Sequence, residues 1–372
     1  MQNPFIIYGY SSSEYFCNRQ EEVDRILTAI ENGRNITLLS LRRMGKTGLI
    51  YHVFDKLALR KKERLLYLDI MPAANLHDFV KEFIRAIVLD ERRRSGNYLN
   101  KIKNLILSLK GKITFDPLTG APGFELDFRN FGETQKDLAT LFQYLSDQKA
   151  TYIIAIDEFQ QITNFTEKNG VALLRAYSQQ YSANLRFIFS GSNKTILSSM
   201  FSQYGNPFYQ SSDILNLGKI NKPDYADFID THFRNNGRSI EKELIYLILD
   251  ELECYTFYVQ FYFNKLWGTQ ILNIDHNLTN NLLADILNER ENTYYNYKSL
   301  LTDNQFLLLK AIAKEGKVTQ PNSSNFLRSN QLGQASSVNR SLQALLDKEM
   351  IYNEGGNYCV YDLFFQKWLS RL

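Results

Sequence analysis

The sequence predicts an α/β fold, a parallel sheet with helices on both faces, followed by an all-helical region and a winged-helix domain. Three observations favour this order. Short apolar runs alternate with helical periodicity up to about residue 213, strand signals fade from residue 214, and the residues after about 300 show a pattern of three helices and a hairpin. We therefore divide the chain into residues 1–213, 214–298 and 299–372.

The composition is that of a folded protein with two or three domains. The chain has 372 residues, of which 44% are hydrophobic and 22% charged, and its formal net charge of +3 gives the whole chain little attraction for nucleic acid. Three scattered cysteines and four scattered histidines show no metal-ligand spacing. The N-terminus lacks a basic region followed by an apolar core, and no apolar run approaches the roughly 20 residues that a membrane span needs. We expect a cytoplasmic protein without membrane contact.

The segment Ser40-Leu41-Arg42-Arg43-Met44-Gly45-Lys46-Thr47 matches the phosphate-loop pattern at every position except the first, where serine replaces glycine. Residues 35–39 before it are an apolar run typical of a strand, and residues 46–59 after it have the apolar spacing of a helix. A glycine-containing turn with an exposed lysine is the alternative. The strand and helix favour a phosphate loop, and hence a P-loop NTPase sheet.

Such a loop binds nucleotide through backbone N–H groups, a lysine on the β/γ oxygens and a hydroxyl on Mg²⁺. Lys46 would act in catalysis, and Thr47 would hold the metal. The loop residues expected to contact the nucleotide are Arg42, Arg43, Met44, Gly45, Lys46, Thr47 and Gly48.

A second apolar run, residues 151–156, ends in the acidic pair Asp157 and Glu158. In a P-loop protein the first acid of such a pair orients Mg²⁺, and the second is placed to polarise a water for attack on the γ-phosphate. The alternative is a helix cap with a first-turn acid. Together with the phosphate loop, the pair predicts that Asp157 is a metal residue and Glu158 the general base.

Two further strands are expected at residues 65–70 and 185–190. The second leads into Ser190-Gly191-Ser192-Asn193, at the sheet edge where ligands bind in such folds. A polar side chain there could sense the γ-phosphate. Ser190, Ser192 and Asn193 are the candidates, and an ordinary polar turn is the alternative.

The segment Phe16-Cys17-Asn18-Arg19-Gln20-Glu21-Glu22 resembles one that precedes the phosphate loop in prokaryotic and archaeal ATPases of the AAA+/STAND group. The double arginine before Met44-Gly45-Lys46-Thr47 is similar to that group too, as is Ile188-Phe189-Ser190-Gly191-Ser192. Weaker likenesses follow at residues 207–210, 258–260 and 266–267. The resemblance covers nearly the whole chain.

This resemblance implies a nucleotide core, a helical lid over residues 214–298 and a C-terminal winged helix. It also implies that Phe16, Asn18 and Arg19 line the adenine side of the pocket, and that ATP and Mg²⁺ are the cofactors. Related sequences often carry an arginine near the position of Asn206, which this chain lacks. Slow or partner-dependent hydrolysis is therefore expected, because an arginine on the γ-phosphate lowers the barrier. Four other arginines could take the place of this arginine, or could be solvated surface charges only: Arg42, Arg43, Arg175 and Arg186.

The C-terminal region combines helical spacing with aromatic residues. Residues 255–267 are densely aromatic, which is more typical of a core between helices than of a binding site. Beyond them, helices are expected at 304–314, around 326 and at 336–348, with hairpin strands at 350–352 and 358–361. Asn339, Arg340 and Gln343 on the third of these helices could read DNA bases. The eight basic and six acidic residues from 303 onward make only a modest net charge for this task.

One segment fits neither the nucleotide core nor the C-terminal region. Residues 91–112 are basic, with Arg92-Arg93-Arg94, Lys101, Lys103, Lys110 and Lys112, and residues 113–128 alternate around a Pro/Gly turn. We expect a hairpin inserted in the core at about 110–130. It could contact an acidic partner or nucleic acid, or could be a solvated helix and hairpin only.

Three functions compete. The first is a slow Mg²⁺-dependent ATPase that acts as a nucleotide-controlled switch and binds ATP and ADP, with a protein partner or a second copy as further partner. The second is a nucleotide-responsive DNA-binding regulator. The third is a small-molecule kinase, which shares the phosphate loop but seldom carries a winged helix.

Overall fold

The chain divides into two compact units. The computed structural model describes residues 2–94, 97–109, 112–115, 122–125, 131–148, 150–167 and 169–372. One unit is Tyr8–Ile220, and the other is Asn221–Leu372 together with Met1–Ile7. The first division lies near the predicted boundary at residue 213. Residues 221–298 and 299–372 fall in one compact unit, so their separation into two domains stays a prediction.

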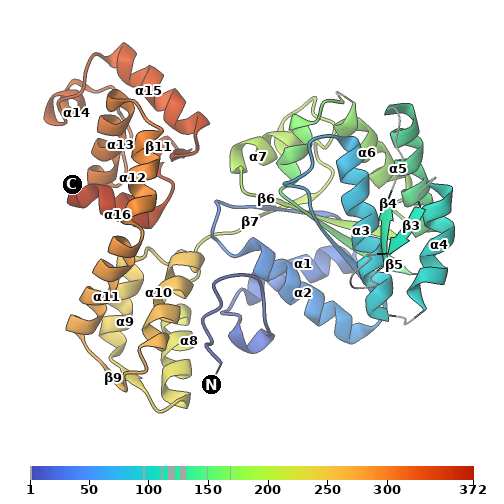
Figure 1. The fold of residues 1–372 in the computed structure, drawn as a ribbon, viewed down its shortest axis with the longest axis horizontal. Coiled ribbons are helices and arrows are strands. Elements are labelled where there is room, and N and C mark those ends of the chain that lie inside the picture. Colours follow the sequence, from blue (N-terminus) through green and yellow to red (C-terminus); the bar gives the residue numbers. More distant parts are fainter. Residues whose placement is uncertain are drawn as a thin grey trace. The chain divides into compact units, whose positions relative to one another are not determined.

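A five-stranded parallel sheet forms the centre of the first unit, in the order β2-β5-β6-β1-β7 (Figure 1). The strands are β1 Ile36–Leu39, β2 Glu63–Asp69, β5 Thr151–Asp157, β6 Leu185–Gly191 and β7 Asp213–Asn216. The first four confirm the predicted strands. Strand signals are predicted to fade from about residue 214, and β7, which was not predicted, spans that position as a four-residue strand at the sheet edge with polar residues at both ends.

Helices cover both faces of the sheet, as the fold class requires (Figure 1). On one side lie α1 Gln20–Glu31 and α2 Lys46–Arg60, so the helix predicted after the phosphate loop is confirmed. The other side carries α3 Leu76–Arg94, α5 Phe131–Ser146, α6 Gly170–Gln180 and α7 Lys194–Ser202. Every residue of β5 from Tyr152 to Asp157 is buried, because both faces of a covered parallel strand are inside.

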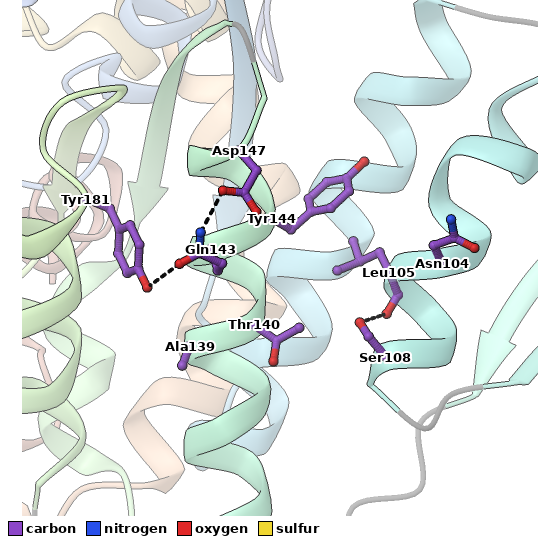
Figure 2. Close-up of a pocket in the computed structure, with 9 residues that line it drawn as sticks. All are labelled: Asn104, Leu105, Ser108, Ala139, Thr140, Gln143, Tyr144, Asp147 and Tyr181. Atoms are coloured by element: carbon purple, nitrogen blue, oxygen red, sulfur yellow. Dashed lines mark hydrogen bonds between the residues drawn. The ribbon is translucent and has the colours of Figure 1, made fainter.

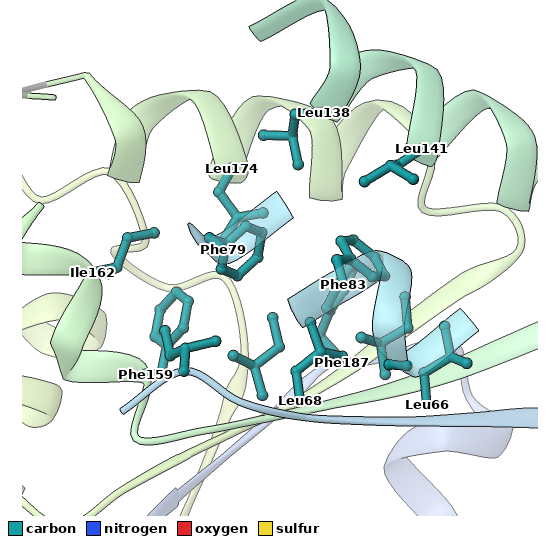
Figure 3. Packing of buried hydrophobic residues seen from close by; sticks show 14 of the residues in the cluster. Leu66, Leu68, Phe79, Phe83, Leu138, Leu141, Phe159, Ile162, Leu174 and Phe187 are labelled. Carbon is teal, nitrogen blue, oxygen red and sulfur yellow. The ribbon is translucent and has the colours of Figure 1, made fainter. Parts of the chain in front are cut away.

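The core on the α3 side is rich in phenylalanine (Figure 3). Phe83 of α3 meets Phe142 of α5 edge to face at a centroid distance of 5.6 Å. Phe159 begins the 3-10 helix η2, Phe159–Asn164, and its ring lies 4.6 Å from that of Phe189 and 5.2 Å from that of Phe208. Full burial of one such ring contributes about 1.5–3 kcal/mol. These contacts fix the backbone directly after Glu158.

The predicted hairpin insertion is present. It follows α4 Tyr98–Ser108 and pairs β3 Lys112–Phe115 antiparallel with β4 Pro122–Glu125. Its turn, residues 126–130 and Lys110 lie outside the described residues. Two of the basic side chains are partly neutralised: Arg94 Nε lies 3.0 Å from Asp90 Oδ1, and Lys101 Nζ lies 3.8 Å from Glu91 Oε2. A partner contact of this region stays a prediction.

The second unit begins with a helical bundle. Its elements are α8 Lys222–Asn235, β8 Ser239–Ile240, α9 Lys242–Glu251, α10 Thr256–Gly268, β9 Asn273–Ile274, α11 His276–Glu289 and α12 Glu291–Ser299. The aromatic stretch 255–267 lies mostly in α10, where Tyr258, Tyr262 and Phe263 are buried, as the core interpretation predicts. Arg238 donates hydrogen bonds to the carbonyls of Leu266, Trp267 and Ile271 and so closes the end of this helix.

The winged-helix pattern is confirmed in the last part of this unit. It comprises α13 Asp303–Glu315, α14 Ser324–Ser329, α15 Ala335–Asp347, β10 Ile351–Glu354, β11 Asn357–Val360 and α16 Leu363–Arg371. Gly355 and Gly356 both have positive φ, 59° and 84°, which a two-residue hairpin turn of this kind requires. The last helix, α16, was not among the predicted elements. Its first N–H, that of Leu363, donates to Tyr258 Oη of α10 at 2.8 Å.

Candidate nucleotide site

The phosphate loop joins the end of β1 to the start of α2. Ser40 is buried, and its hydroxyl donates to the carbonyl of Leu41 at 2.9 Å. The left-handed residues of the loop are Arg43, with φ 68°, and Gly45, with φ 86°. Ser40 does not have positive φ, so serine at this first position carries no backbone penalty of the kind that glycine avoids. The single mismatch with the motif is therefore compatible with its conformation.

Asp157 gathers hydroxyl groups at the carboxyl end of β5. Its Oδ2 accepts from Thr47 Oγ1 and from Tyr67 Oη, each at 2.9 Å, and its Oδ1 accepts from Ser190 Oγ. The register of the parallel strands β2 and β5, which pairs Asp69 with Asp157, brings Tyr67 of β2 close to this carboxylate. The structure thus brings together Thr47 and Asp157, which are 110 residues apart.

Glu158 has left-handed backbone, with φ 55°, and its side chain does not cap η2. A 3-10 helix does begin at the next residue, so the helix-cap alternative is right about the helix and wrong about the cap. The carboxylate instead accepts from Gln160 Nε2 at 2.5 Å, Ser192 Oγ at 2.7 Å and Ser192 N at 3.2 Å.

Lys46 is buried at the first turn of α2. Burial lowers the pKa of its ammonium group, and the charges of Asp157 and Glu158 oppose that shift. Burial also raises the pKa of the Asp69 carboxyl; the Met71 N–H counteracts this, and the charges of Asp157 and Glu158 add to it. A cation and three carboxylates therefore share one edge of the sheet, the arrangement expected where a polyanion and a metal bind.

The three sensor candidates have different contacts. Ser190 donates to Asp157 and Ser192 to Glu158, whereas the side chain of Asn193 accepts from Ile196 N and caps α7. Asn193 therefore stabilises the turn before α7, as the alternative of an ordinary polar turn predicts. The Nε of Arg42 donates to Ser192 Oγ at 3.2 Å, which connects the phosphate loop to the end of β6.

The residues expected on the adenine side lie around the start of α2. The ring of Phe16 stacks on that of His52 at 4.2 Å, and its Cε2 lies 3.7 Å from where a Cβ on Gly48 would be. Arg19 is buried and donates to the carbonyl of Met44 in the phosphate loop at 3.2 Å. Asn18 accepts a long hydrogen bond from Gln20 N, 3.4 Å, before α1. Phe16 and Arg19 thus border the loop, and Asn18 stabilises the entry to α1.

His52 and Tyr10 were not singled out from the sequence. The Tyr10 hydroxyl lies 3.1 Å from His52 Nδ1 and donates to Asp55 Oδ2 at 2.8 Å. Burial raises the pKa of Tyr10 to about 12, the Ser13 hydrogen bond opposes this, and Asp55 adds to it. These contacts hold the segment before α1 against α2.

Arg186 and Arg175 are not placed to supply a charge at the phosphates. Arg186 stands near the amino end of β6 and donates to the carbonyls of Ser182 and Leu185, whereas the site lies at the carboxyl ends of the strands. Arg175 donates to Gln179 on α6. Arg42, by contrast, contacts a site residue, Ser192.

The donor set fits Mg²⁺. The metal prefers one or two protein oxygens and completes its shell with water and phosphate oxygens. Thr47 Oγ1 and Asp157 Oδ2, in direct contact at 2.9 Å, are such a pair. Among the described residues no group of three or more His, Cys, Asp or Glu could form an all-protein metal site.

A cavity of about 500 Å³ lies elsewhere, between α4 and α5 (Figure 2). Its wall includes Gln143, which accepts from Tyr181 Oη at 3.1 Å and donates to Asp147 at 2.6 Å. None of the predicted nucleotide residues lines it.

The fold and the site define a P-loop ATPase with a C-terminal winged helix. A sequence profile described as an ATPase domain predominantly from Archaea matches residues 16–252, and one for a probable winged helix domain matches residues 292–371. The chain belongs to this ATPase family. Nucleotide binding is the property that the family implies.

Solved structures agree with this assignment at the level of fold. The Walker-type ATPase PABY2304 of Pyrococcus abyssi is similar with a TM-score of 0.65 and 16% identity, covering 99% of this chain and 100% of that one. The ORC2 protein of Aeropyrum pernix, in ADPNP-ADP complexes, has a TM-score of 0.58 and 12% identity, covering 100% and 97%. The ORC1 protein of the same organism, in complex with DNA, has a TM-score of 0.51 and 13% identity, covering 96% of this chain and 93% of that one. No curated protein sequence matches the chain.

The described parts of the chain contain no helix that is long and apolar enough to cross a membrane.

Proposed function

We propose that this protein binds ATP and hydrolyses its β–γ bond slowly, with Mg²⁺, and that its nucleotide state works as a switch. The observation that carries the proposal is the contact of Thr47 with Asp157 at the end of β5, with Lys46 and Glu158 beside them. The family and the ATPase fold support it.

In this function the chain's own groups divide the work. Lys46 and the loop N–H groups at the start of α2 bind the phosphates, where the helix dipole also favours negative charge. Glu158 takes the proton of the attacking water. Mg²⁺, when bound by Thr47 and Asp157, would neutralise charge on the β- and γ-oxygens. Slow turnover is expected because the sequence has no arginine near Asn206, and because the side chain of Arg42 is already bonded to Ser192.

We also infer that residues 214–298 act as a lid and 299–372 as a separate winged helix whose placement responds to nucleotide, with protein partners or self-association as readout. A cytoplasmic location suits such a switch. The hydrogen bonds from Leu363 N to Tyr258 and between Tyr255 and Tyr352, 2.9 Å, would transmit a lid movement to the winged helix.

Calorimetry and turnover assays test the central claim. Lys46→Ala should weaken ATP binding by at least about tenfold, since it removes a charge-assisted contact worth more than 1.4 kcal/mol. Lys62→Ala, an exposed lysine after α2, is the matched control. Unchanged affinity in Lys46→Ala would remove the claim.

Glu158→Gln should lower kcat by about 10²–10⁴, the usual contribution of a general base, and leave ATP affinity intact. Glu21→Gln on the exposed side of α1 is its control. If the wild-type protein shows no turnover above background, with or without Mg²⁺, the enzyme part of the proposal is wrong.

The second candidate is a nucleotide-responsive DNA-binding regulator. The observation that favours it is the exposure of Asn339, Arg340 and Gln343 on α15, the helix that reads the major groove in DNA-binding winged helices. The similar ORC1 protein is in complex with DNA. Titration of a fluorescent duplex at several salt concentrations tests this, since phosphate contacts give a steep salt dependence. Arg340→Ala should weaken binding and Lys314→Ala on α13 should not.

A further inference from the structure

Glu158 is held by one of its two carboxylate oxygens. In the described part of the chain the three hydrogen bonds that its side chain accepts all end on Oε2, from Gln160 Nε2, Ser192 Oγ and Ser192 N. Because every anchor is on Oε2, Oε1 remains available to another donor. A carboxylate anchored on one side and open on the other is suited to take a proton from a water in a fixed direction.

Gln160 makes the shortest of these contacts, 2.5 Å, and its side chain is buried. Its amide orientation follows from chemistry: an amide oxygen facing Glu158 Oε2 would place two acceptors together, so the NH₂ group must face the carboxylate. The other amide atom, Oε1, is buried without a hydrogen-bond partner among the described residues. A buried acceptor of this kind is costly, and the charge-assisted bond to Glu158 offsets the cost.

The end of β6 is shaped around this side chain. A Cβ built on Gly191 would lie 2.0 Å from Gln160 Oε1, which is closer than any two such atoms can approach. Glycine at 191 therefore leaves the space that the Gln160 amide fills. The fixed position of Phe159 among Phe189 and Phe208 sets where this amide starts from the backbone.

We propose that Gln160 is a positioning residue for ATP hydrolysis, which anchors Oε2 of Glu158 and so directs Oε1 toward the attacking water. This inference rests on the proposed ATPase function. In the step, the water oxygen forms a bond to the γ-phosphorus and its proton passes to Glu158 Oε1. The bond from the γ-phosphorus to the bridging oxygen breaks, and its electron pair stays on ADP.

Gln160→Glu is the sharpest test, because it keeps the shape and replaces the donor by an acceptor that repels Glu158. We expect kcat at pH 8 to fall at least about tenfold, the effect of losing one charge-assisted bond, with KM for ATP changed less than about threefold. As the pH is lowered toward 6, the introduced carboxyl takes up a proton and can donate again. The ratio of variant to wild-type kcat should therefore rise.

Gln161→Glu is the matched control. It adds the same charge one residue away, where the native side chain bonds to Ala73 O and Asn164 and not to Glu158. Its kcat should stay near that of the wild type with no pH-dependent recovery. Equal pH profiles for the two variants would overturn the inference, because the loss would then come from added charge alone.

Gly191→Ala provides an independent route to the same contact. Its methyl group should displace Gln160 and lower kcat as much as Gln160→Ala does, while the double variant Gly191→Ala/Gln160→Ala should lose no more than either single one, because they break one contact. Losses that multiply would count against the inference.

A double-mutant cycle of Gln160 and Glu158, measured by melting temperature, separates failure of this inference from failure of the proposed function. Gln160→Ala should lower the melting temperature in the wild-type background and lower it less in the Glu158→Ala background. Equal losses in the two backgrounds overturn the contact, whatever the turnover. If the wild-type protein shows no turnover but the two backgrounds differ clearly, the contact between Gln160 and Glu158 is supported. The ATPase function is then rejected, and with it the role of Gln160 in hydrolysis.

Discussion

The hydroxyl of Thr47 donates to Asp157 Oδ2 at 2.9 Å, and this bond links the helix after the phosphate loop to the end of β5. Tyr67 donates to the same oxygen at the same distance. Both hydroxyl groups thus meet the carboxylate that we expect to orient Mg²⁺, so substitutions at these two positions should separate metal binding from structural support.

Thr47→Ala should lower the affinity for ATP about tenfold when Mg²⁺ is present, by removing one oxygen from the metal's shell, and change it little in EDTA. Thr47→Ser retains the hydroxyl and should behave like the wild type. Calorimetry with and without Mg²⁺ measures both. An equal loss with and without the metal would show that Thr47 serves the fold and not the metal.

Tyr67→Phe removes one hydrogen bond to a buried carboxylate and should lower the free energy of unfolding by about 1.5 kcal/mol. Tyr51→Phe is the control, because its ring lies 4.9 Å from that of Tyr67 and its hydroxyl has no hydrogen-bond partner among the described residues. Urea unfolding of both variants decides. Equal losses in the two would contradict a specific role of the Tyr67–Asp157 bond.

Arg238→Met should destabilise the C-terminal unit by about 2 kcal/mol or more, because two carbonyl groups at the end of α10 and that of Ile271 beyond it lose their shared donor. The guanidinium also lies over the Phe233 and Trp267 rings, at 4.9 and 5.2 Å. Arg234→Met is the control, since Arg234 is 71% exposed and pairs only with Asp230 in the described structure. It should change stability by less than about 0.5 kcal/mol, as surface pairs usually do. Similar thermal shifts for the two variants would refute this ranking.

His52 should make stability depend on pH. Burial lowers its pKa, Lys56 adds to the shift and Asp55 opposes it. Between that lowered pKa and the ordinary value of about 6.5, the unfolded chain binds more protons than the folded one, so the contribution is complete above about pH 6.5 and is lost as the pH falls. His77 is shifted in the same direction, also mainly by burial.

His52→Phe keeps an aromatic ring against Phe16 and removes the titrating group. The free energy of unfolding, measured in urea at steps from pH 7.5 to about 5, should then decline less steeply than in the wild type. Lys62→Ala should leave the slope unchanged. A slope for His52→Phe as steep as that of the wild type would exclude His52 as the source.

Local pattern was enough to predict most elements of the fold. Buried parallel strands are continuous apolar runs and helices repeat every three to four residues, so β1, β2, β5, β6 and the helices α13, α14 and α15 of the winged helix were predicted from the sequence. β7 was missed because a short edge strand contacts only one neighbour and needs little apolar character. α16 was not predicted, although its buried residues Leu363, Phe364, Phe365, Trp368 and Leu369 recur at helical spacing.

The candidate site was predictable where a motif specifies a role and not where contact across the fold creates one. Lys46, Thr47, Asp157 and Glu158 follow from residue type and spacing. Tyr67, His52 and Gln160 carry no motif, and the only signal for Tyr67 is a hydroxyl-bearing residue near the end of a strand that runs parallel to β5.

The class of protein follows from features that are local in the chain, namely a phosphate loop, its acidic partner strand and the α/β alternation. The side chains that hold the two acids, in contrast, come together only when the chain is folded. The parallel register brings Tyr67 and Ser190 to Asp157, and the position of α2 brings Thr47 there. The packing of Phe159 together with Gly191 places Gln160 on Glu158. Those contacts depend on distances between strands that are far apart in the sequence, and no local pattern encodes such distances.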